Sequence, residues 1–319
     1  MKKSVFLWLL VYVVLLLIPF IIGDNRYFFY IIVTTMLWIM VAISINIITG
    51  TAGLLSIAHG GFFGIGAYTS AVLVTQYGAS TYLSFPAAII ITGICSLLVG
   101  IPALKLKGAY FAIGTLIYGA IITMIIEKWE SLTKGTYGIF AIPPENSIPV
   151  PLIGSIGFNS ITGQYYLILF FTIIFYFIMS RLVKSPKGLV LLSIREKEDL
   201  TESLGINIRK NKLICFILSS VMMGIAGFLY AHFVGYLSPD DSSFFIQFQG
   251  LIFCVIGGLG TLLGPIVGSI ILNVIPEFLH VFKGYRLIFF GVMLLCFILF
   301  MPHGLMGAYY KYAANKKRK

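Results

Sequence analysis

Residues 27–48 read YFFYIIVTTMLWIMVAISINII, an apolar run without a single charged side chain. A helix needs about 20 predominantly apolar residues to cross the hydrocarbon core of a bilayer, so this run is long enough to span a membrane. Residues 49–68 then read TGTAGLLSIAHGGFFGIGAY and crowd glycine and hydroxyl side chains into the start of another apolar run. Glycine lets helices approach each other closely, and it also lets a helix break.

The same apolar character extends over the whole chain. Of its 319 residues, 59% are hydrophobic and 10% are charged, and the mean hydropathy is +1.00. Because soluble domains carry about 25% charged residues, this composition excludes an ordinary soluble enzyme, a disordered tail and a nucleic-acid-binding domain. We therefore predict an all-α polytopic membrane protein with one transmembrane domain over residues 1–319.

Ten apolar runs are candidates for membrane-spanning helices. The eighth and ninth runs are short and meet at Thr261, where the helices are expected to be broken or re-entrant. The ten runs are 5–22, 27–48, 60–76, 82–101, 109–126, 165–181, 213–235, 244–258, 262–279 and 286–301.

The basic residues predict the orientation of these spans. Most of the 22 lysines and arginines lie near the two termini, at Lys105 and Lys107, or within residues 181–212. Lysine and arginine concentrate in cytoplasmic loops, so we predict both termini and the loop 182–212 in the cytoplasm and the loop 127–164 outside. The four cysteines stand alone without metal-ligand or redox spacing, and no metal site is expected.

Polar and small residues inside the apolar runs, or in the stretch between the second and third runs at the membrane boundary or within it, are candidates for a substrate pathway, because such groups are costly within a membrane. Close helix packing is the alternative interpretation of the glycines, and a hydrogen-bonded packing role is the alternative for the histidine. The candidates are Asn46, Ser56, His59, Gly60, Gly61, Gly64 and Gln247. A second glycine-rich segment, 257–268, lacks the lysine of a phosphate-binding loop, so nucleotide binding is not expected there.

The cytoplasmic loop is predicted to contain a short helix over residues 193–204. Ser193 and Glu196 have the spacing of a capping box at a helix start, and Gly205 suits the left-handed position that ends a helix. Arg195, Leu200 and Leu204 lie within or at the end of the same segment. The apolar side chains do not form a clean stripe, so docking on a partner protein and lying on the membrane surface both remain open.

Several segments, taken in order, resemble the permease subunit of branched-chain amino-acid ABC importers of the Liv type. The resemblance covers residues 46–305 and is carried by the motifs 50–68, KGAYFAI at 107–113, LGIN at 204–207, SPD at 238–240 and 257–268. It implies a second homologous permease, two cytoplasmic ATP-binding subunits that hold ATP–Mg, and an extracellular solute-binding protein. It also implies a prokaryotic inner (plasma) membrane location, no cofactor on this chain, and the segment from Ser193 to Gly205 as the coupling helix that the ATPases contact.

Three alternatives are kept beside this interpretation. Relatives of this type also carry urea and short amides, so the substrate class is open. A secondary transporter driven by an ion gradient would be expected to place carboxylates at membrane depth, and no Asp or Glu lies at the centre of a predicted span. An intramembrane enzyme using Ser56 and His59 lacks an evident third orienting group.

Overall fold

The computed structural model of the protein describes residues 15–19, 25–146, 148–150, 154–158, 160–278, 291, 295 and 304–308. Within these ranges the fold is helical apart from one short antiparallel hairpin, in which Val150 of β1 pairs with Gly154 of β2. The elements are α2 (Arg26–Ile45), the π-helix η1 (Asn46–Thr51), α3 (His59–Thr75), α4 (Thr81–Ala103), α5 (Ala109–Lys128), α6 (Glu130–Thr133), η2 (Gly135–Tyr137), β1 (Ile148–Val150), β2 (Gly154–Ile156), α7 (Ile161–Lys184), α8 (Pro186–Glu196), α9 (Glu198–Ser203), α10 (Ile208–Val234), η3 (Pro239–Ser242), α11 (Phe244–Gly257) and α12 (Gly264–Phe278).

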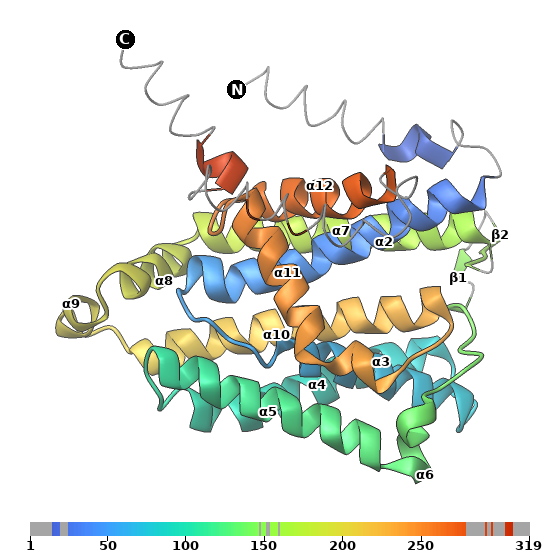
Figure 1. The fold of residues 1–319 in the computed structure, drawn as a ribbon, viewed down its shortest axis with the longest axis horizontal. Coiled ribbons are helices and arrows are strands. Elements are labelled where there is room, and N and C mark those ends of the chain that lie inside the picture. Colours follow the sequence, from blue (N-terminus) through green and yellow to red (C-terminus); the bar gives the residue numbers. More distant parts are fainter. Residues whose placement is uncertain are drawn as a thin grey trace.

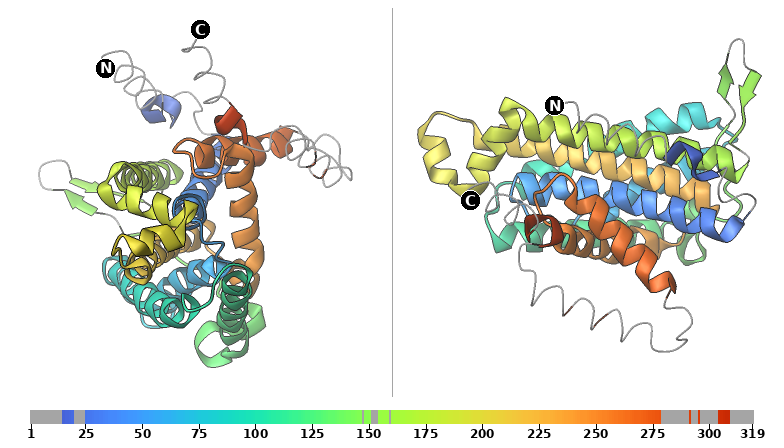
Figure 2. Two further views of the ribbon diagram at one scale, coloured as in Figure 1. Left: turned by 90° about the vertical axis from the view of Figure 1, so that its left-hand side faces the viewer. Right: turned by 90° about the horizontal axis from the view of Figure 1, so that it is seen from above.

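Two helices form the centre of a bundle whose long members run side by side (Figures 1 and 2). The helix α2 packs against α7, α10, α11 and α12, and α10 also packs against α3 and α4. In the most apolar 18-residue stretches of α2 with η1 and of α10, 78% and 61% of the residues are buried. In those of α4, α5 and α7 only 22–28% are buried. The outer helices therefore present long apolar faces, as expected where lipid or another subunit covers them.

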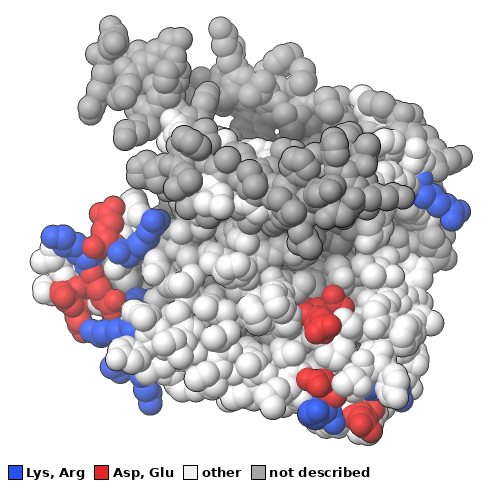
Figure 3. All heavy atoms as spheres, viewed as in Figure 1, with Lys and Arg blue, Asp and Glu red and all other residues white. Residues whose placement is uncertain are grey.

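The helices have the length and composition of a multi-pass membrane protein. Among the described residues, five helical stretches are long and apolar enough to cross a bilayer: 26–51, α4, α5, α7 and α10. Charged side chains gather toward the two ends of the long helices, most densely around α8 and α9, and the surface between is largely uncharged (Figure 3). This distribution places the uncharged belt where hydrocarbon would surround the protein.

Each of the eight middle runs predicted from the sequence coincides with a helix. The predicted run 27–48 is α2 with η1, and the short eighth and ninth runs are α11 and α12, of 14 and 15 residues. Most of the first run, 5–22, and of the tenth, 286–301, lies outside the described residues.

The predicted helix over 193–204 is wrong in its boundaries. Ser193 and Glu196 lie at the end of α8 rather than at a helix start, and Lys197, in extended conformation, separates α8 from α9. The physical reason is a stronger start signal upstream: the Ser185 hydroxyl accepts a hydrogen bond from the Gly188 N–H at 3.2 Å, and Pro186 occupies the first helical position. The Ser193 hydroxyl instead donates to the Val190 carbonyl. Gly205, with φ of 78°, has the predicted left-handed conformation.

Candidate functional site

The chain between η1 and α3 leaves the helical path, with Ser56 and Ala58 buried in the bundle and Gly53 and Leu55 exposed. Ser56 is fully buried, and side chains from distant elements satisfy the backbone around it. The Gln247 amide donates to the Ser56 carbonyl at 2.8 Å, and the Ile57 N–H donates to the Thr115 hydroxyl at 3.0 Å. Because a buried irregular backbone needs such partners, residues 52–58 form a hydrogen-bonded interruption between two helices.

Asn46 ties this interruption to the turn between α11 and α12. Its side-chain Oδ1 accepts from the Gly260 N–H at 2.8 Å, and its Nδ2 donates to the Thr261 carbonyl at 2.9 Å. Asn46 is only 1% exposed, and it stands at the first position of the π-helix, a form often found at functional sites. The structure thus joins the two glycine-rich segments that the sequence presented separately.

His59 bridges the same interruption to α10. Its Nδ1 lies 3.0 Å from the Ser56 hydroxyl, and its Nε2 lies 2.8 Å from the Ser219 hydroxyl. Ser219 already donates to the Phe216 carbonyl at 2.9 Å. The consistent assignment therefore has His59 donate from Nε2 and accept from Ser56 at Nδ1. The imidazole is fully buried, so this Ser–His pair is sealed from substrate and water, unlike the nucleophile of an enzyme.

The glycines at the start of α3 mark close contacts with neighbouring backbone and side chains. A Cβ atom on Gly60 would lie 2.1 Å from the Ser243 carbonyl oxygen, and one on Gly64 would lie 2.2 Å from Ser242 Cβ. Gly61 has more room, with the Ile122 side chain at 3.0 Å. The predicted tight packing is present at Gly60 and Gly64, and a role of these glycines in a pathway remains a prediction.

The segment α8–α9 contacts the interruption directly through Arg195. The Arg195 guanidinium donates to the Gly50 carbonyl at the end of η1. A Cβ atom on Gly53 would lie 2.6 Å from Arg195 Cγ, and one on Gly260 would lie 2.7 Å from its Nη1. One side chain thus touches both glycine-rich segments and links them to the helices predicted to dock a partner.

A polar cavity of about 170 Å³ lies where these segments meet. It is lined by residues 52–55, by the connection 106–108 between α4 and α5, and by Arg195 and Glu198. Glu198 pairs with Lys212 at 2.7 Å, which holds α9 against the start of α10. By contrast, the predicted docking residues Leu200 and Leu204 are 60% and 79% exposed.

Sequence analysis missed the partners that complete this site. Ser219 and Thr115 lie in ordinary apolar helices, and nothing local in those helices distinguishes them from lipid-facing hydroxyls. His232 is also buried, 2% exposed, and its Nε2 lies 2.7 Å from the Ser70 hydroxyl. Asn273 bridges α12 to α2, since its amide donates to the Thr35 hydroxyl at 2.7 Å.

Comparison with known proteins identifies relatives of this chain. The profile of the family described as "Branched-chain amino acid transport system / permease component" matches residues 27–298. The chain is 30% identical over 289 residues to the high-affinity branched-chain amino acid transport system permease protein LivM of Escherichia coli (strain K12), a match that covers 85% of this chain and 68% of that protein. It is 24% identical over 280 residues to the corresponding permease protein LivH of Salmonella typhimurium, covering 84% of this chain and 90% of that protein. No solved structure matches the chain.

Proposed function

Because this chain belongs to the family of branched-chain amino-acid transport permeases, we propose that it forms part of the membrane path of an importer for branched-chain amino acids. It is a transport permease and not an enzyme. The family match over residues 27–298 is the observation that carries this conclusion. Neither a urea or amide substrate nor an ion-gradient drive is favoured, because the relatives are named for branched-chain amino-acid transport.

A second, homologous permease is expected to complete the path. Relatives of two kinds, LivM and LivH, match the chain, and the paired names support an importer built from two related subunits. The apolar faces of α4, α5 and α7 supply surface for lipid and for such a subunit, because only 22–28% of the residues in their most apolar parts are buried in the single chain.

Two cytoplasmic ATP-binding subunits are proposed to drive the cycle and to hold ATP–Mg, while this chain itself binds no cofactor. Leu200 and Leu204 are exposed on the α8–α9 projection and offer apolar contacts to such a partner. Arg195 then connects this projection to the interrupted helices. An extracellular solute-binding protein is proposed to deliver the amino acid at the opposite end.

Ten spans in the inner (plasma) membrane of a prokaryotic cell, with both termini in the cytoplasm, are proposed for the whole chain. Four segments lie together at one end of the bundle: 52–55, 106–108, 194–198 and 258–260. If α8 and α9 are cytoplasmic, all four segments are on the cytoplasmic side. Lys107, Arg195 and Lys212 stand at this end, which agrees with the excess of basic residues in cytoplasmic loops.

The buried polar cluster of Ser56, His59 and Gln247 is proposed to form the closed barrier of the path. Gln247 Oε1 has no hydrogen-bond partner among the described residues although it is buried. An unsatisfied buried acceptor is costly. We therefore expect Gln247 Oε1 to gain a hydrogen-bond donor when the barrier opens.

Reconstitution tests the function. The chain, a LivH-type permease, two ATPase subunits and a solute-binding protein are assembled in proteoliposomes with ATP enclosed on the ATPase side. Leucine uptake that requires both ATP and this chain is expected. Uptake that follows a proton gradient and persists without ATP would overturn the proposal.

Docking is tested separately with the double substitution Leu200→Asp and Leu204→Asp. Because the two leucines are exposed, the variant should fold and insert normally but should lose the ATPase subunits during purification. Leu189→Asp, at another exposed position on α8, is the matched control. Unchanged co-purification of the ATPases with the double variant would remove these leucines from the interface.

A further inference from the structure

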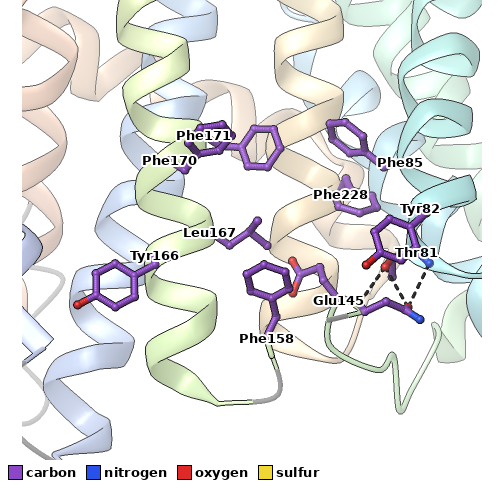
Figure 4. A pocket seen from close by; sticks show the side chains of 11 residues that line it. Thr81, Tyr82, Phe85, Glu145, Phe158, Tyr166, Leu167, Phe170, Phe171 and Phe228 are labelled. Carbon is purple, nitrogen blue, oxygen red and sulfur yellow. Dashed lines mark hydrogen bonds between the residues drawn. The ribbon is translucent and has the colours of Figure 1, made fainter. Parts of the chain in front are cut away.

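A larger cavity, of about 470 Å³, lies at the end of the bundle opposite α8 and α9 (Figures 1 and 4). The starts of α4 and α7, the end of α10 and the loop after η2 enclose it. Its wall is almost entirely apolar and mainly aromatic: Tyr82, Phe85, Phe158, Tyr166, Phe170, Phe171 and Phe228, with Leu167. Its volume is in the range of small-molecule sites.

One carboxylate projects into this aromatic wall. Glu145 is 5% exposed, and neither of its side-chain oxygens has a hydrogen-bond partner among the described residues. Figure 4 shows the carboxylate among Phe158, Leu167 and Phe228. Burial raises the pKa of Glu145 to about 7, and no Lys or Arg is among the described residues that line the cavity.

The loop that carries Glu145 is anchored on both sides of the cavity. Asn146 Oδ1 accepts from the Thr81 hydroxyl at 2.9 Å, and the Asn146 N–H donates to the same hydroxyl oxygen at 2.9 Å. On the other side, His232 Nδ1 lies 2.6 Å from the Pro143 carbonyl oxygen. The inward position of Glu145 is therefore fixed by α4 and α10, although an unpaired buried carboxylate is unfavourable by itself.

The chemistry of the cavity selects a ligand that is both cationic and apolar. A carboxylate in an apolar setting pairs strongly with an ammonium group, and aromatic faces attract a cation. The remaining wall accepts an aliphatic or aromatic group. At the rim, Asn146 is exposed and its side-chain Nδ2 can donate to an anion, while its Oδ1 accepts from the Thr81 N–H and hydroxyl.

We propose that this cavity binds the transported amino acid at the outer end of the protein, with its ammonium group on Glu145, its apolar side chain among the rings and its carboxylate at the Asn146 rim. This proposal rests on the proposed function, because it takes the ligand to be the substrate of the importer. It assigns to Glu145 the selection of ligands that carry an ammonium group.

The test uses the full chain in nanodiscs of phosphatidylglycerol, a lipid without an ammonium group. Saturation-transfer NMR with millimolar leucine is expected to show binding to the wild type, and binding at least about tenfold weaker to Glu145→Gln. The matched control is Glu130→Gln, the same change on an exposed glutamate, which should bind as the wild type does. The deaminated analogue 4-methylpentanoate should bind weakly and equally to all three proteins.

The pH dependence gives a second measurement. Leucine binding to the wild type should weaken as the pH falls from 8 to 6, because protonation removes the charge of Glu145, whereas weak binding to Glu145→Gln should not change. Equal leucine binding by the wild type and Glu145→Gln, or no leucine binding at all, would overturn the proposal. A third outcome would also overturn the proposal: the wild type, but not Glu145→Gln, retains added phosphatidylethanolamine in mass spectrometry, and neither protein binds leucine. The cavity would then bind a lipid headgroup.

Failure of this proposal and failure of the proposed function are distinguishable. ATP-driven leucine uptake by the reconstituted complex with unchanged leucine binding by Glu145→Gln would refute only the cavity. Absence of ATP-driven uptake by the wild-type complex would refute the importer, whatever the isolated chain binds.

Discussion

Asn46 uses both ends of its amide on one turn of backbone, accepting from the Gly260 N–H and donating to the Thr261 carbonyl. Arg195 donates to the Gly50 carbonyl, which lies four residues after Asn46 in η1. Both side chains satisfy backbone groups that a continuous helix would satisfy by itself. Asn46 does so where it is buried and an unpaired group would be costly. Polar residues at these positions therefore hold the interrupted helices in register.

Gly66 lies where α3 approaches α10 closely. A Cβ atom there would lie 2.0 Å from the Gly224 carbonyl oxygen, whereas one on Gly93 of α4 would meet only Val221 Cγ2 at 3.7 Å. Gly66→Ala should lower the free energy of unfolding by about 1–3 kcal/mol, because backbone must move. Gly93→Ala should be neutral or stabilising, because alanine favours the helix. Thermal unfolding in detergent measures both, and equal midpoints would contradict the close contact.

Glu145 should make stability depend on pH. Its pKa is about 4.3 in an unfolded chain and about 7 in the folded protein. Between these values the folded state holds a proton that the unfolded state has released, so stability is full below pH 4 and falls as the pH rises to 7. The loss is about 3 kcal/mol in the ligand-free protein.

The measurement is the unfolding midpoint of the wild type and of Glu145→Gln at several pH values between 4.5 and 7.5. The wild type should lose stability relative to the variant as the pH rises, while Glu130→Gln should follow the wild type. Parallel curves for the wild type and Glu145→Gln would show that the carboxylate is ionised or paired throughout.

Sequence reasoning identified the polar residues that stand out against an apolar background, and it did not find their partners. Asn46 and Gln247 were predicted because each is strongly polar within a predicted span, and His59 because it is strongly polar just before one. The structure buries all three. Ser219 and Glu145 were missed. A serine within an apolar helix is common, and a glutamate after two prolines resembles any solvated loop residue, because burial there depends on contacts with helices distant in sequence.

At the scale of elements, Arg195 connects α8 to η1 and to the turn between α11 and α12, so we expect these segments to move together. Arg195→Ala should reduce leucine uptake by at least about tenfold, because one side chain supplies both the hydrogen bond to Gly50 and the contacts at Gly53 and Gly260. ATPase subunits should still co-purify, since their proposed contacts lie elsewhere on the projection. The measured quantity is leucine transported per ATP hydrolysed.

Lys187→Ala is the matched control for Arg195, because Lys187 is a basic residue on the same helix that is exposed. Its uptake should equal that of the wild type. Arg195→Lys keeps the charge but offers a single point of contact in place of the guanidinium fork, and it should give intermediate uptake. If Arg195→Ala transports as much leucine per ATP hydrolysed as the wild type, Arg195 does not transmit the movement of α8 and α9 to residues 52–58.

Helices with a continuous apolar run were predictable, and the cytoplasmic helices were not. A span must be long and apolar whatever it packs against, so the eight middle runs coincide with helices. Two start signals competed at 185–196: the serine–proline pair at Ser185 and the capping box at Ser193. The upstream signal prevailed because proline at the first helical position fixes φ, and the helix then ran through Ser193.

At the scale of the whole molecule, the two ends of the bundle differ in chemistry. Arg195, Lys107 and Lys212 surround the small polar cavity at one end, whereas the cavity at the other end is aromatic with a single carboxylate. The proposed importer would use this asymmetry, since one end would meet the ATP-binding subunits and the other would meet the substrate.

The orientation of this asymmetry is open to direct measurement. The α8–α9 end should face the cytoplasm, because basic residues are retained there during insertion. Two strongly exposed positions report on the two ends: Leu204, 79% exposed, follows α9, and Tyr137, 80% exposed, lies in η2. Each is changed to cysteine in a chain whose four native cysteines are replaced by alanine. In intact cells a membrane-impermeant maleimide should label Tyr137→Cys at once, and Leu204→Cys only after the membrane is permeabilised. The reverse pattern would place α8 and α9 outside the cell, where no ATPase could drive them, and would refute the coupling role of Arg195 together with the proposed topology.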